Sequence, residues 1–415
     1  MNTAKSFEIS KHIVLDAYKR VKSNKGGAGV DGVDFVKFEE NLKGNLYKIW
    51  NRMSSGSYIP PAVRIVEIPK VTGGVRKLGI PTISDRIAQM VAKIYFEPLV
   101  APYFHQDSYG YRPNKSALDA VGKTRQRCWK YNWVIDLDIK GFFDNLDHEL
   151  VMRAVRKHTD SQWIQLYIER WLKAPAQMQD GTIIIREKGT PQGGVISPLI
   201  SNLFLHYGFD KWMERNYPEN PFERYADDAV VHCKTKEEAQ KLKEAIATRL
   251  LECGLELHAG KTKIAYCKDD DRPGKSKINS FDFLGYTFRA RKVKARGGRY
   301  FTGFNPAISN SSAKAIRKRI KGWKFHRWTD KSISELAQIC RRVIQGWINY
   351  YGKYYKSEIY SVLQYLDGKL LQWTKSKYKR LKGSTVKASE LLLKIAKSNP
   401  YLFPHWQRTI KTIRR

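Results

Sequence analysis

The stretch from Glu223 to Cys233, Glu-Arg-Tyr-Ala-Asp-Asp-Ala-Val-Val-His-Cys, predicts two short strands joined by an acidic turn. An apolar run upstream, from Asn132 to Asp138, predicts a buried strand that ends in carboxylates. A carboxylate at the end of an apolar strand is costly unless a cation lies beside it. For either cluster taken alone, a plain acidic turn or cap is the alternative.

A hard divalent cation fits such clusters, because Mg²⁺ binds few carboxylates together with substrate phosphates. Two ions about 4 Å apart can activate a 3′-hydroxyl and stabilise a leaving oxygen. Asp138, Asp227 and Asp228 supply three carboxylates from two strands, and Asp136 lies one pleat period before Asp138 on the same face. Without metal, these carboxylates would repel one another and hold protons more tightly. The rest of the sequence is needed to distinguish a metal site from a plain acidic turn or cap.

Strand and helix patterns alternate irregularly around these stretches. Period-two patterns predict strands at Arg64–Pro69, Thr182–Ile185, Ile264–Cys267 and Phe281–Phe288, with a hairpin signal at Thr72–Gly74. Helical spacing predicts helices from Ser84 toward Pro98 and at Glu149–His158, Gln162–Trp171, Pro198–Arg215 and Lys236–Cys253. The sequence beyond Ser309 is almost wholly helical in pattern. This mixed order predicts an α+β core rather than a doubly wound sheet.

Charge is divided unevenly along the 415 residues, which carry a net charge of +35. Residues 289–415 hold 31 Lys and Arg against 5 Asp and Glu, a surplus of +26. Residues 1–288 hold 44 basic and 35 acidic residues, a surplus of only +9. Aromatic residues alternate with the C-terminal cations, and they can stack on bases or pack a helical core. We therefore expect a body followed by a segment that grips nucleic acid, with a solvated basic surface as the alternative.

The sequence lacks the features that mark membrane-spanning, secreted, disulfide-linked and zinc-binding proteins. A membrane span needs about 20 consecutive apolar residues, and no run reaches that length. The N-terminus has no apolar signal-peptide core. The five cysteines are scattered without a Cys-x-x-Cys pair, which favours a reducing cytosol over a disulfide framework or zinc site. The histidines show no metal-ligand or catalytic spacing either.

A series of blocks resembles the reverse transcriptases, and in particular the proteins encoded by group II introns. The YADD sequence at 225–228 resembles their Y-x-D-D signature, and Asp138–Asp144 resembles their first palm carboxylate with its aromatic pair. Further blocks follow the family order: RKLGIP at 76–81 with Asp85-Arg86, SYGYRP at 108–113, GTPQGGVISP at 189–198, GLEL at 254–257 with KTK at 261–263, FLGY at 283–286, and GWINYY at 346–351.

The resemblance implies a right-hand polymerase with fingers, palm and a helical, basic thumb or maturase region. Asp138, Asp227 and Asp228 would form its catalytic and metal-binding triad, with Asp136 as the second choice for the first position. The same resemblance assigns Ile139 to the metal site. The expected cofactors are two Mg²⁺ ions, with Mn²⁺ as a substitute, and the expected substrates are deoxynucleoside triphosphates.

Six residues match nucleotide-binding positions of the family. Lys70 and Arg76 would clamp the triphosphate, with a solvated hairpin as the alternative. Phe142 or Phe143 would lie under the sugar and reject a ribose 2′-hydroxyl, while the other packs in the core. Gln192 would contact the nucleotide, and Gly193 and Gly194 would let backbone approach closely. Lys261 would lie near the leaving pyrophosphate or form a structural salt bridge. The FLGY block would grip the primer end or pack as a hairpin.

Four segments follow from these matches. Residues 1–62 form an N-terminal extension, whose Gly26–Gly32 stretch resembles the family's template-embracing segment. Residues 63–290 form the fingers and palm, residues 291–385 the helical thumb or maturase domain, and residues 386–415 a short basic segment that can bind DNA. Many relatives end in a Cys-rich H-N-H nuclease, and no such Cys and His set is present. The expected form is therefore one without the endonuclease domain.

The expected function is RNA-directed DNA synthesis, together with binding of group II intron RNA for splicing and retrotransposition. One alternative is a maturase that acts only in splicing, against which the intact triad argues. Another is a group II-like reverse transcriptase adopted for defence, repair or CRISPR adaptation. A retron-type or diversity-generating enzyme and a DNA-templated polymerase are weaker alternatives.

The expected partners are an RNA template, intron RNA and a DNA primer or target, with no membrane and with a homodimer left open. The bacterial cytoplasm or nucleoid is the expected location.

Overall fold

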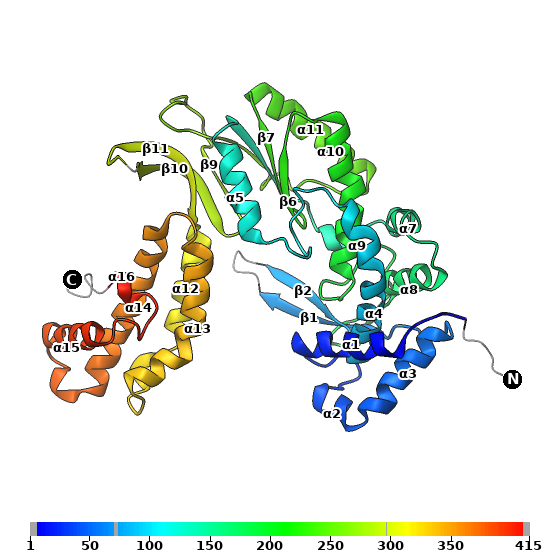
Figure 1. Cartoon of the computed structure of the whole chain (residues 1–415), viewed down its shortest axis with the longest axis horizontal. Helices are drawn as coiled ribbons and strands as arrows, with labels where there is room; N and C mark the ends of the chain where they lie inside the picture. Colours follow the sequence, from blue (N-terminus) through cyan, green and yellow to red (C-terminus); the bar gives the residue numbers. More distant parts are fainter. Residues whose placement is uncertain (1–5, 70–73, 296, 410–415) are drawn as a thin grey trace. The chain divides into compact units, whose positions relative to one another are not determined.

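The computed structural model describes residues 6–69, 74–295 and 297–409 (Figure 1). The chain divides into two compact units. The first unit comprises Met1–Ser116, Leu137–Val231 and Lys236–Thr262, and the second comprises Ala117–Asp136, His232–Thr235 and Lys263–Arg415. Both units mix helices with strands, as the α+β prediction requires.

Three capped helices open the first unit: α1 (Lys11–Ser23), α2 (Phe35–Glu40) and α3 (Leu42–Ser54). The side chains of Ser10, Asp34 and Asn41 accept the first free backbone N–H groups of these helices, so each helix begins at a sequence-encoded cap. The Gly-rich loop between α1 and α2 packs on Thr82, because a Cβ on Gly29 would fall 2.6 Å from the Thr82 Cα. The loop therefore has a local packing role, whatever it binds.

A four-stranded sheet of order β2-β1-β4-β5 follows in the first unit. The strands are β1 (Val63–Pro69), β2 (Val75–Ile80), β4 (Ala176–Gln177) and β5 (Ile183–Ile184). Strands β1 and β2 are antiparallel, with Arg64 opposite Ile80 and Pro69 opposite Val75. The strand predictions at 64–69 and 182–185 are confirmed. The residues before Pro81, expected to be a connection, are the second half of β2, and Thr72-Gly73 lies outside the described residues.

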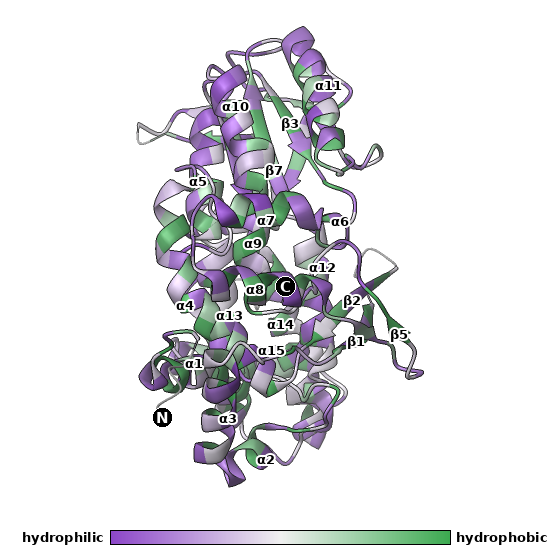
Figure 2. Cartoon of the chain, turned by 90° about the vertical axis from the view of Figure 1, so that its right-hand side faces the viewer, coloured by the Kyte–Doolittle hydropathy of each residue, from purple (hydrophilic) through white to green (hydrophobic). Residues whose placement is uncertain are grey.

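The remaining elements of the first unit are mostly helices. They are α4 (Ile83–Val100), η1 (Ala101–Tyr103), α6 (Phe142–Asn145), α7 (His148–Arg156), α8 (Gln162–Lys173), α9 (Ser197–Leu205), η2 (His206–Asp210), α10 (Lys211–Asn216) and α11 (Lys236–Glu252). Helix α9 is largely hydrophobic along its whole ribbon (Figure 2), so it forms the centre of this part of the core. The predicted helix over 198–215 is continuous, but its middle turn is a π-helix at His206–Asp210.

The strands β6 (Phe222–Tyr225) and β7 (Asp228–Cys233) form the antiparallel hairpin predicted from the opening stretch. Tyr225 and Asp228 are the closing pair of this hairpin. Ala226 and Asp227 are therefore the two residues of its turn, and the acidic residues lie at the hairpin tip.

The second unit begins with α5 (Ala117–Cys128) and β3 (Trp133–Leu137), which pairs antiparallel with β8 (Lys263–Tyr266). Its three-stranded sheet has the order β11-β10-β9, from β9 (Ser280–Phe283), β10 (Tyr286–Lys294) and β11 (Tyr300–Ile308). The single strand predicted at 281–288 is wrong, because Leu284 and Gly285 adopt positive φ and make a hairpin turn. The strands over 291–308 were not predicted, because Lys and Arg mask the alternation of β10, and β11 contains Gly303 and Pro306, which are unusual inside strands.

Helices complete the second unit, as predicted beyond Ser309. They are α12 (Asn310–Gly322), η3 (Phe325–Arg327), α13 (Ile333–Tyr351), α14 (Lys356–Lys377), η4 (Lys379–Leu381), α15 (Thr385–Ser398) and α16 (Trp406–Thr409). Trp373 is 1% exposed at the centre of their core, and its indole N–H donates to the Trp328 carbonyl at 2.9 Å. None of the helices within the described ranges is long and apolar enough to cross a membrane.

Asp85 joins three elements of the first unit. Its carboxylate accepts hydrogen bonds from the Tyr58 hydroxyl at 2.9 Å, the Trp171 indole at 2.8 Å and the Gln89 amide at 2.9 Å. Burial raises the pKa of Asp85 to about 6. This acceptor therefore ties the segment before β1 to α4 and α8.

We predict that Asp85→Ala lowers the free energy of unfolding by about 3 kcal/mol, because it leaves three buried donors without an acceptor. Urea unfolding followed by tryptophan fluorescence measures the change. Asp16→Ala is the control, since it removes only an exposed ion pair to Arg20 within α1 and should cost less than about 0.5 kcal/mol. Equal losses in the two variants would contradict the role given to Asp85.

Candidate polymerase active site

The acidic turn between β6 and β7 has a strained backbone. Ala226 adopts φ +58°, in the left-handed region that costs a residue with a Cβ about 1 kcal/mol. Two-residue hairpin loops favour positive φ because it matches the twist of the strands. The segment around Gly110 packs tightly against the turn, since a Cβ on Gly110 would fall 2.4 Å from the Ala226 nitrogen. The turn is therefore held in one conformation from outside.

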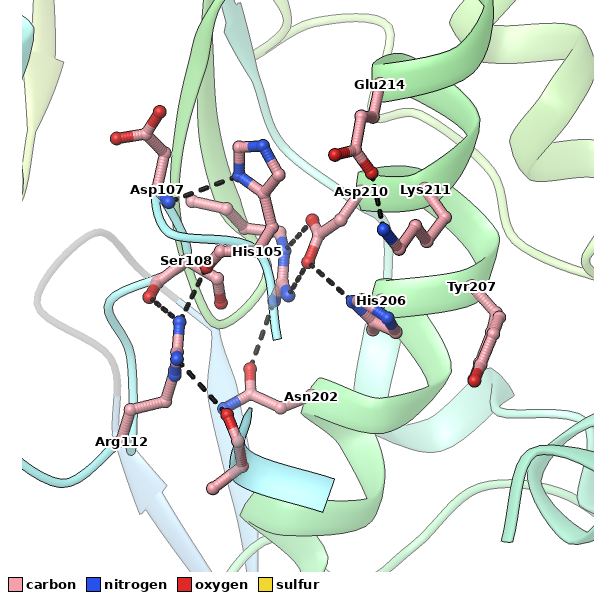
Figure 3. A network of polar contacts seen from close by, with 12 residues as sticks. His105, Asp107, Ser108, Arg112, Asn202, His206, Tyr207, Asp210, Lys211 and Glu214 are labelled. Carbon is pink, nitrogen blue, oxygen red and sulfur yellow. Dashed lines mark hydrogen bonds and ion pairs between the residues drawn. The ribbon is translucent and has the colours of Figure 1, made fainter. Parts of the chain in front are cut away.

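Arg224, at 1% exposure, provides the main contact that holds the turn. Its guanidinium donates to both carboxylate oxygens of Asp210 at 2.7 and 2.6 Å. It also donates to the Asn202 side-chain oxygen and to the Ala226 carbonyl, each at 3.0 Å. Figure 3 shows Asn202 and Asp210 on the same side of the continuous helix. This buried ion pair links the turn to that helix.

The SYGYRP block lies against the same turn. The Tyr109 N–H donates to the Arg224 carbonyl at 2.8 Å, and the Asn202 amide donates to the Gly110 carbonyl at 2.6 Å. Burial lowers the pKa of His206 to about 4, and its ring nitrogen lies 3.9 Å from Asp210. Arg224 rather than His206 therefore balances the charge of Asp210. The sequence offered no signal for this network beyond the Arg that precedes YADD.

Asp138 directly follows β3 and is positioned by the segment after α11. The Asp138 carbonyl accepts from the His258 N–H at 2.8 Å, and the next residue, Ile139, forms an isolated antiparallel bridge with Leu257. The Asp138 carboxylate forms an ion pair with the Lys261 ammonium at 3.2 Å. Lys261 therefore forms the salt bridge given as one alternative, and its partner is the first candidate metal ligand.

The three carboxylates interact electrostatically. Surrounding protein raises the pKa of Asp228 to about 7, although solvent reaches the side chain, and Asp227 and Asp138 raise it further. Burial is also the main cause that raises the pKa of Asp227, with Asp138 adding to it. Arg76 opposes both shifts, and Lys261 opposes that of Asp228. A cation bound among these groups would relieve the repulsion.

Donor chemistry fits a hard cation, because all three side chains are carboxylates. Within the described ranges, no three His, Cys, Asp or Glu side chains form a ready-made metal cluster. A site for Mg²⁺ does not need one, since this ion commonly takes one or two carboxylates plus substrate phosphates. The carboxylates fit such a shared site, which is completed by substrate.

The structure distinguishes the two candidate sugar-contacting residues. Phe142 is 2% exposed and packs with its ring centroid 6.5 Å from that of Phe204. Phe143 is half-buried, with its ring centroid 5.2 Å from that of Phe142. Phe142 therefore belongs to the core, and Phe143 is the one that a ligand can reach.

The remaining predicted residues have different surroundings. Arg76 lies exposed on β2, and its charge opposes the rise in the pKa values of Asp227 and Asp228. Gln192 is half-buried, and its carbonyl accepts from the Gly79 N–H at 2.8 Å. A Cβ on Gly193 would fall 2.3 Å from the Gly79 carbonyl, so the close approach here is to β2. Asp136 lies opposite Lys263 in the β3–β8 pair. Lys70 lies outside the described residues.

Comparison with known families assigns two segments of the chain, the first of which contains this site. Residues 68–288, more than half of the chain, match the model described as "Reverse transcriptase (RNA-dependent DNA polymerase)". The chain belongs to the reverse transcriptase family. Residues 313–390 of this reverse transcriptase match the "Group II intron, maturase-specific domain". Its fold is therefore the predicted right-hand polymerase of the α+β class, and its function is that of a reverse transcriptase with a maturase domain.

Curated relatives agree with this assignment. "Protein YkfC" of Escherichia coli is 32% identical over 319 residues, which cover 66% of this chain and 79% of YkfC. "Group II intron-encoded protein LtrA" of Lactococcus lactis is 30% identical over 239 residues, 55% of this chain and 38% of LtrA. The reverse transcriptase thus spans well under half of LtrA. A solved telomerase from Candida albicans aligns with a TM-score of 0.47 at 10% identity, over 90% of this chain and 70% of that chain.

We predict that Arg224→Met lowers the free energy of unfolding by about 3–5 kcal/mol, because it strands the buried Asp210 carboxylate. The double variant Arg224→Met with Asp210→Leu should recover most of this stability. Primer extension should stay low in both variants, since neither holds the Ala226 carbonyl. Urea unfolding and a primer-extension assay measure the two effects.

Lys211→Ala is the matched control, because it breaks only an exposed pair with Glu214 on the same helix. Full extension by the double variant would show that the ion pair stabilises the fold without positioning the turn.

Proposed function

We propose that Asp138, Asp227 and Asp228 bind two Mg²⁺ ions, for which Mn²⁺ can substitute, during DNA synthesis on an RNA template. The observation that carries this proposal is that Asp227 and Asp228, whose pKa values burial and the charge of Asp138 raise, lie at a strained turn that is held from outside. When bound, the ions would neutralise the phosphates and lower the pKa of the primer 3′-hydroxyl. Ile139, whose side chain is buried, would take part only through its backbone.

The chain's own cations and aromatic residues would position the incoming nucleotide. Arg76 is exposed on β2 within electrostatic reach of Asp227 and Asp228, so it can bind the triphosphate. Lys261 is 61% exposed and can exchange its pair with Asp138 for a phosphate oxygen. Phe143 would exclude a 2′-hydroxyl, and Gln192 would border the base. Lys70, proposed from the family pattern alone, would join Arg76.

The second unit would bind intron RNA as a maturase. Residues 289–415 carry a surplus of +26, and the maturase-specific match at 313–390 covers all of α13 and α14 and part of α12 and α15. Phosphate neutralisation by many Lys and Arg gives strong binding without base reading. We propose that this binding supports splicing and retrotransposition, that DNA serves as primer or target, and that the enzyme works in the bacterial cytoplasm or nucleoid.

Asp227→Ala combined with Asp228→Ala should abolish primer extension on an RNA template with deoxynucleotides and Mg²⁺, because it removes two of the three metal ligands. Binding of intron RNA, measured by filter retention, should remain within about twofold, since the cations of the second unit are intact. Glu214→Ala is the control, as an exposed acidic residue away from the three carboxylates. Extension by the double variant would refute the site assignment.

Phe143→Ala should relax sugar discrimination, with the ratio of kcat/KM for deoxynucleotides to that for ribonucleotides falling about tenfold or more. The physical reason is that removing the reachable ring opens space for a 2′-hydroxyl. Phe142→Leu serves as the comparison, because this buried ring should affect stability and leave the ratio unchanged. Single-nucleotide incorporation kinetics give both values. A change in the ratio for Phe142→Leu alone would reverse the assignment.

A further inference from the structure

A pocket of about 390 Å³ lies in the first unit, and none of the proposed active-site residues lines it. Its walls come from α7, α10, α11 and the junction of α9 with the π-helical turn. The lining residues are Leu150, Arg153, Ala154, Lys157, Phe204, Tyr207, Gly208, Arg215, Arg249 and Cys253. The volume falls within the range of about 300–1,000 Å³ that is usual for small-ligand sites.

Four cations and no carboxylate line this pocket. The absence of acidic lining is notable in this part of the chain, because residues 1–288 carry 44 basic against 35 acidic residues. In the described part of the chain, Arg153, Lys157 and Arg215 are exposed and form no ion pair with a carboxylate. Their charges are therefore free to meet an anion.

The fourth cation, Arg249, is fixed in place by the π-helix. Its guanidinium donates to the Gly208 carbonyl at 3.1 Å and to the Tyr207 carbonyl at 3.4 Å, and it pairs with Glu252 at 2.9 Å. The wider turn of a π-helix changes which carbonyls are bonded within the helix, and Arg249 covers two of them. This part of the wall is thus already ordered before any ligand arrives, and because Glu252 balances Arg249, the three exposed cations carry the free positive charge.

The floor of the pocket is apolar and aromatic, from Phe204, Tyr207 and Cys253 among others. The exposed Lys157 ammonium lies over the Tyr207 ring, 4.8 Å from its centroid, so a base can stack on that face if Lys157 moves to the phosphate. Figure 3 shows Tyr207 turned away from the contacts of Asp210. A simple anion would leave this floor unused, whereas an aromatic base can stack on it.

We propose that this pocket is a second nucleotide-binding site, which takes a phosphorylated nucleoside with its phosphate among the cations and its base on the aromatic floor. The ligand is either a free nucleotide or one nucleotide of an RNA chain, since both present the same chemistry. The site extends the enzyme's nucleic-acid contacts beyond the polymerase centre and the basic second unit.

Two probes test the proposal on the full chain in EDTA, which removes the divalent ions needed for nucleotide binding at the polymerase centre. One is a fluorescent analogue of adenosine monophosphate, and the other is a five-nucleotide oligoribonucleotide containing 2-aminopurine. The variant Arg153→Ala with Arg215→Ala should bind at least one probe about tenfold or more weakly than wild type. Arg156→Ala is the matched control, because it lies on the same helix outside the pocket lining and near Glu149.

The two probes distinguish the sources of the ligand. Weaker binding of the monophosphate in the double variant supports a free nucleotide, and an effect confined to the oligoribonucleotide supports an RNA chain. Equal binding of both probes by the double variant and the control would overturn the proposal. Inorganic phosphate that displaces the monophosphate as well as unlabelled adenosine monophosphate does would overturn the role of the aromatic floor. Primer extension should stay within about twofold of wild type throughout.

Discussion

The buried ion pair between Arg224 and Asp210 is the contact on which the candidate active site depends. An isolated buried charge is costly. Here the Arg224 guanidinium donates to both carboxylate oxygens of Asp210 and to two further acceptors, so its Nε, Nη1 and Nη2 atoms all form hydrogen bonds. The pair holds the two-residue turn of Ala226 and Asp227 in one position, so the turn is a fixed support for the carboxylates. The left-handed Ala226 can persist because the surrounding contacts determine its conformation.

The carboxylates that this support presents are placed at a cost to stability. Asp227 and Asp228 hold protons more tightly than free aspartates, since protein surrounds them and Asp138 adds its charge. Lys261 offsets part of that repulsion through its pair with Asp138. Such an arrangement is unfavourable in a structural turn and useful where cations and phosphates bind. The raised pKa values therefore favour a cation-binding acidic turn over a turn with only a structural role.

Much of this could be predicted from the sequence, because the decisive signals are local. The β6–β7 hairpin, the strand before Asp138 and most helices follow from alternation and helical spacing. The structural network did not follow, since Asp210 and Asn202 contact Arg224 only after the chain folds back, and nothing in their own surroundings marks them. The β10–β11 hairpin was missed for another reason: the exposed positions of β10 are Lys and Arg, which resemble the basic helical sequence that follows, and Gly303 and Pro306 interrupt the strand pattern of β11.

Aromatic residues that lie among the Lys and Arg of the C-terminal part are partly or fully buried. Eight aromatic residues here have Lys and Arg neighbours in the sequence, and none of them is fully exposed: Trp323, Trp328, Trp347, Tyr350, Tyr351, Tyr354, Tyr355 and Trp373. Several hydroxyls are also engaged: Tyr350 donates to the Leu284 carbonyl at 2.8 Å and Tyr355 to the Lys292 carbonyl at 2.8 Å. These rings therefore contribute to the packing of the second unit, and Tyr350 also holds the β9–β10 turn. The RNA binding proposed for this unit would therefore rest chiefly on contacts between its Lys and Arg side chains and phosphates, and it would depend steeply on salt.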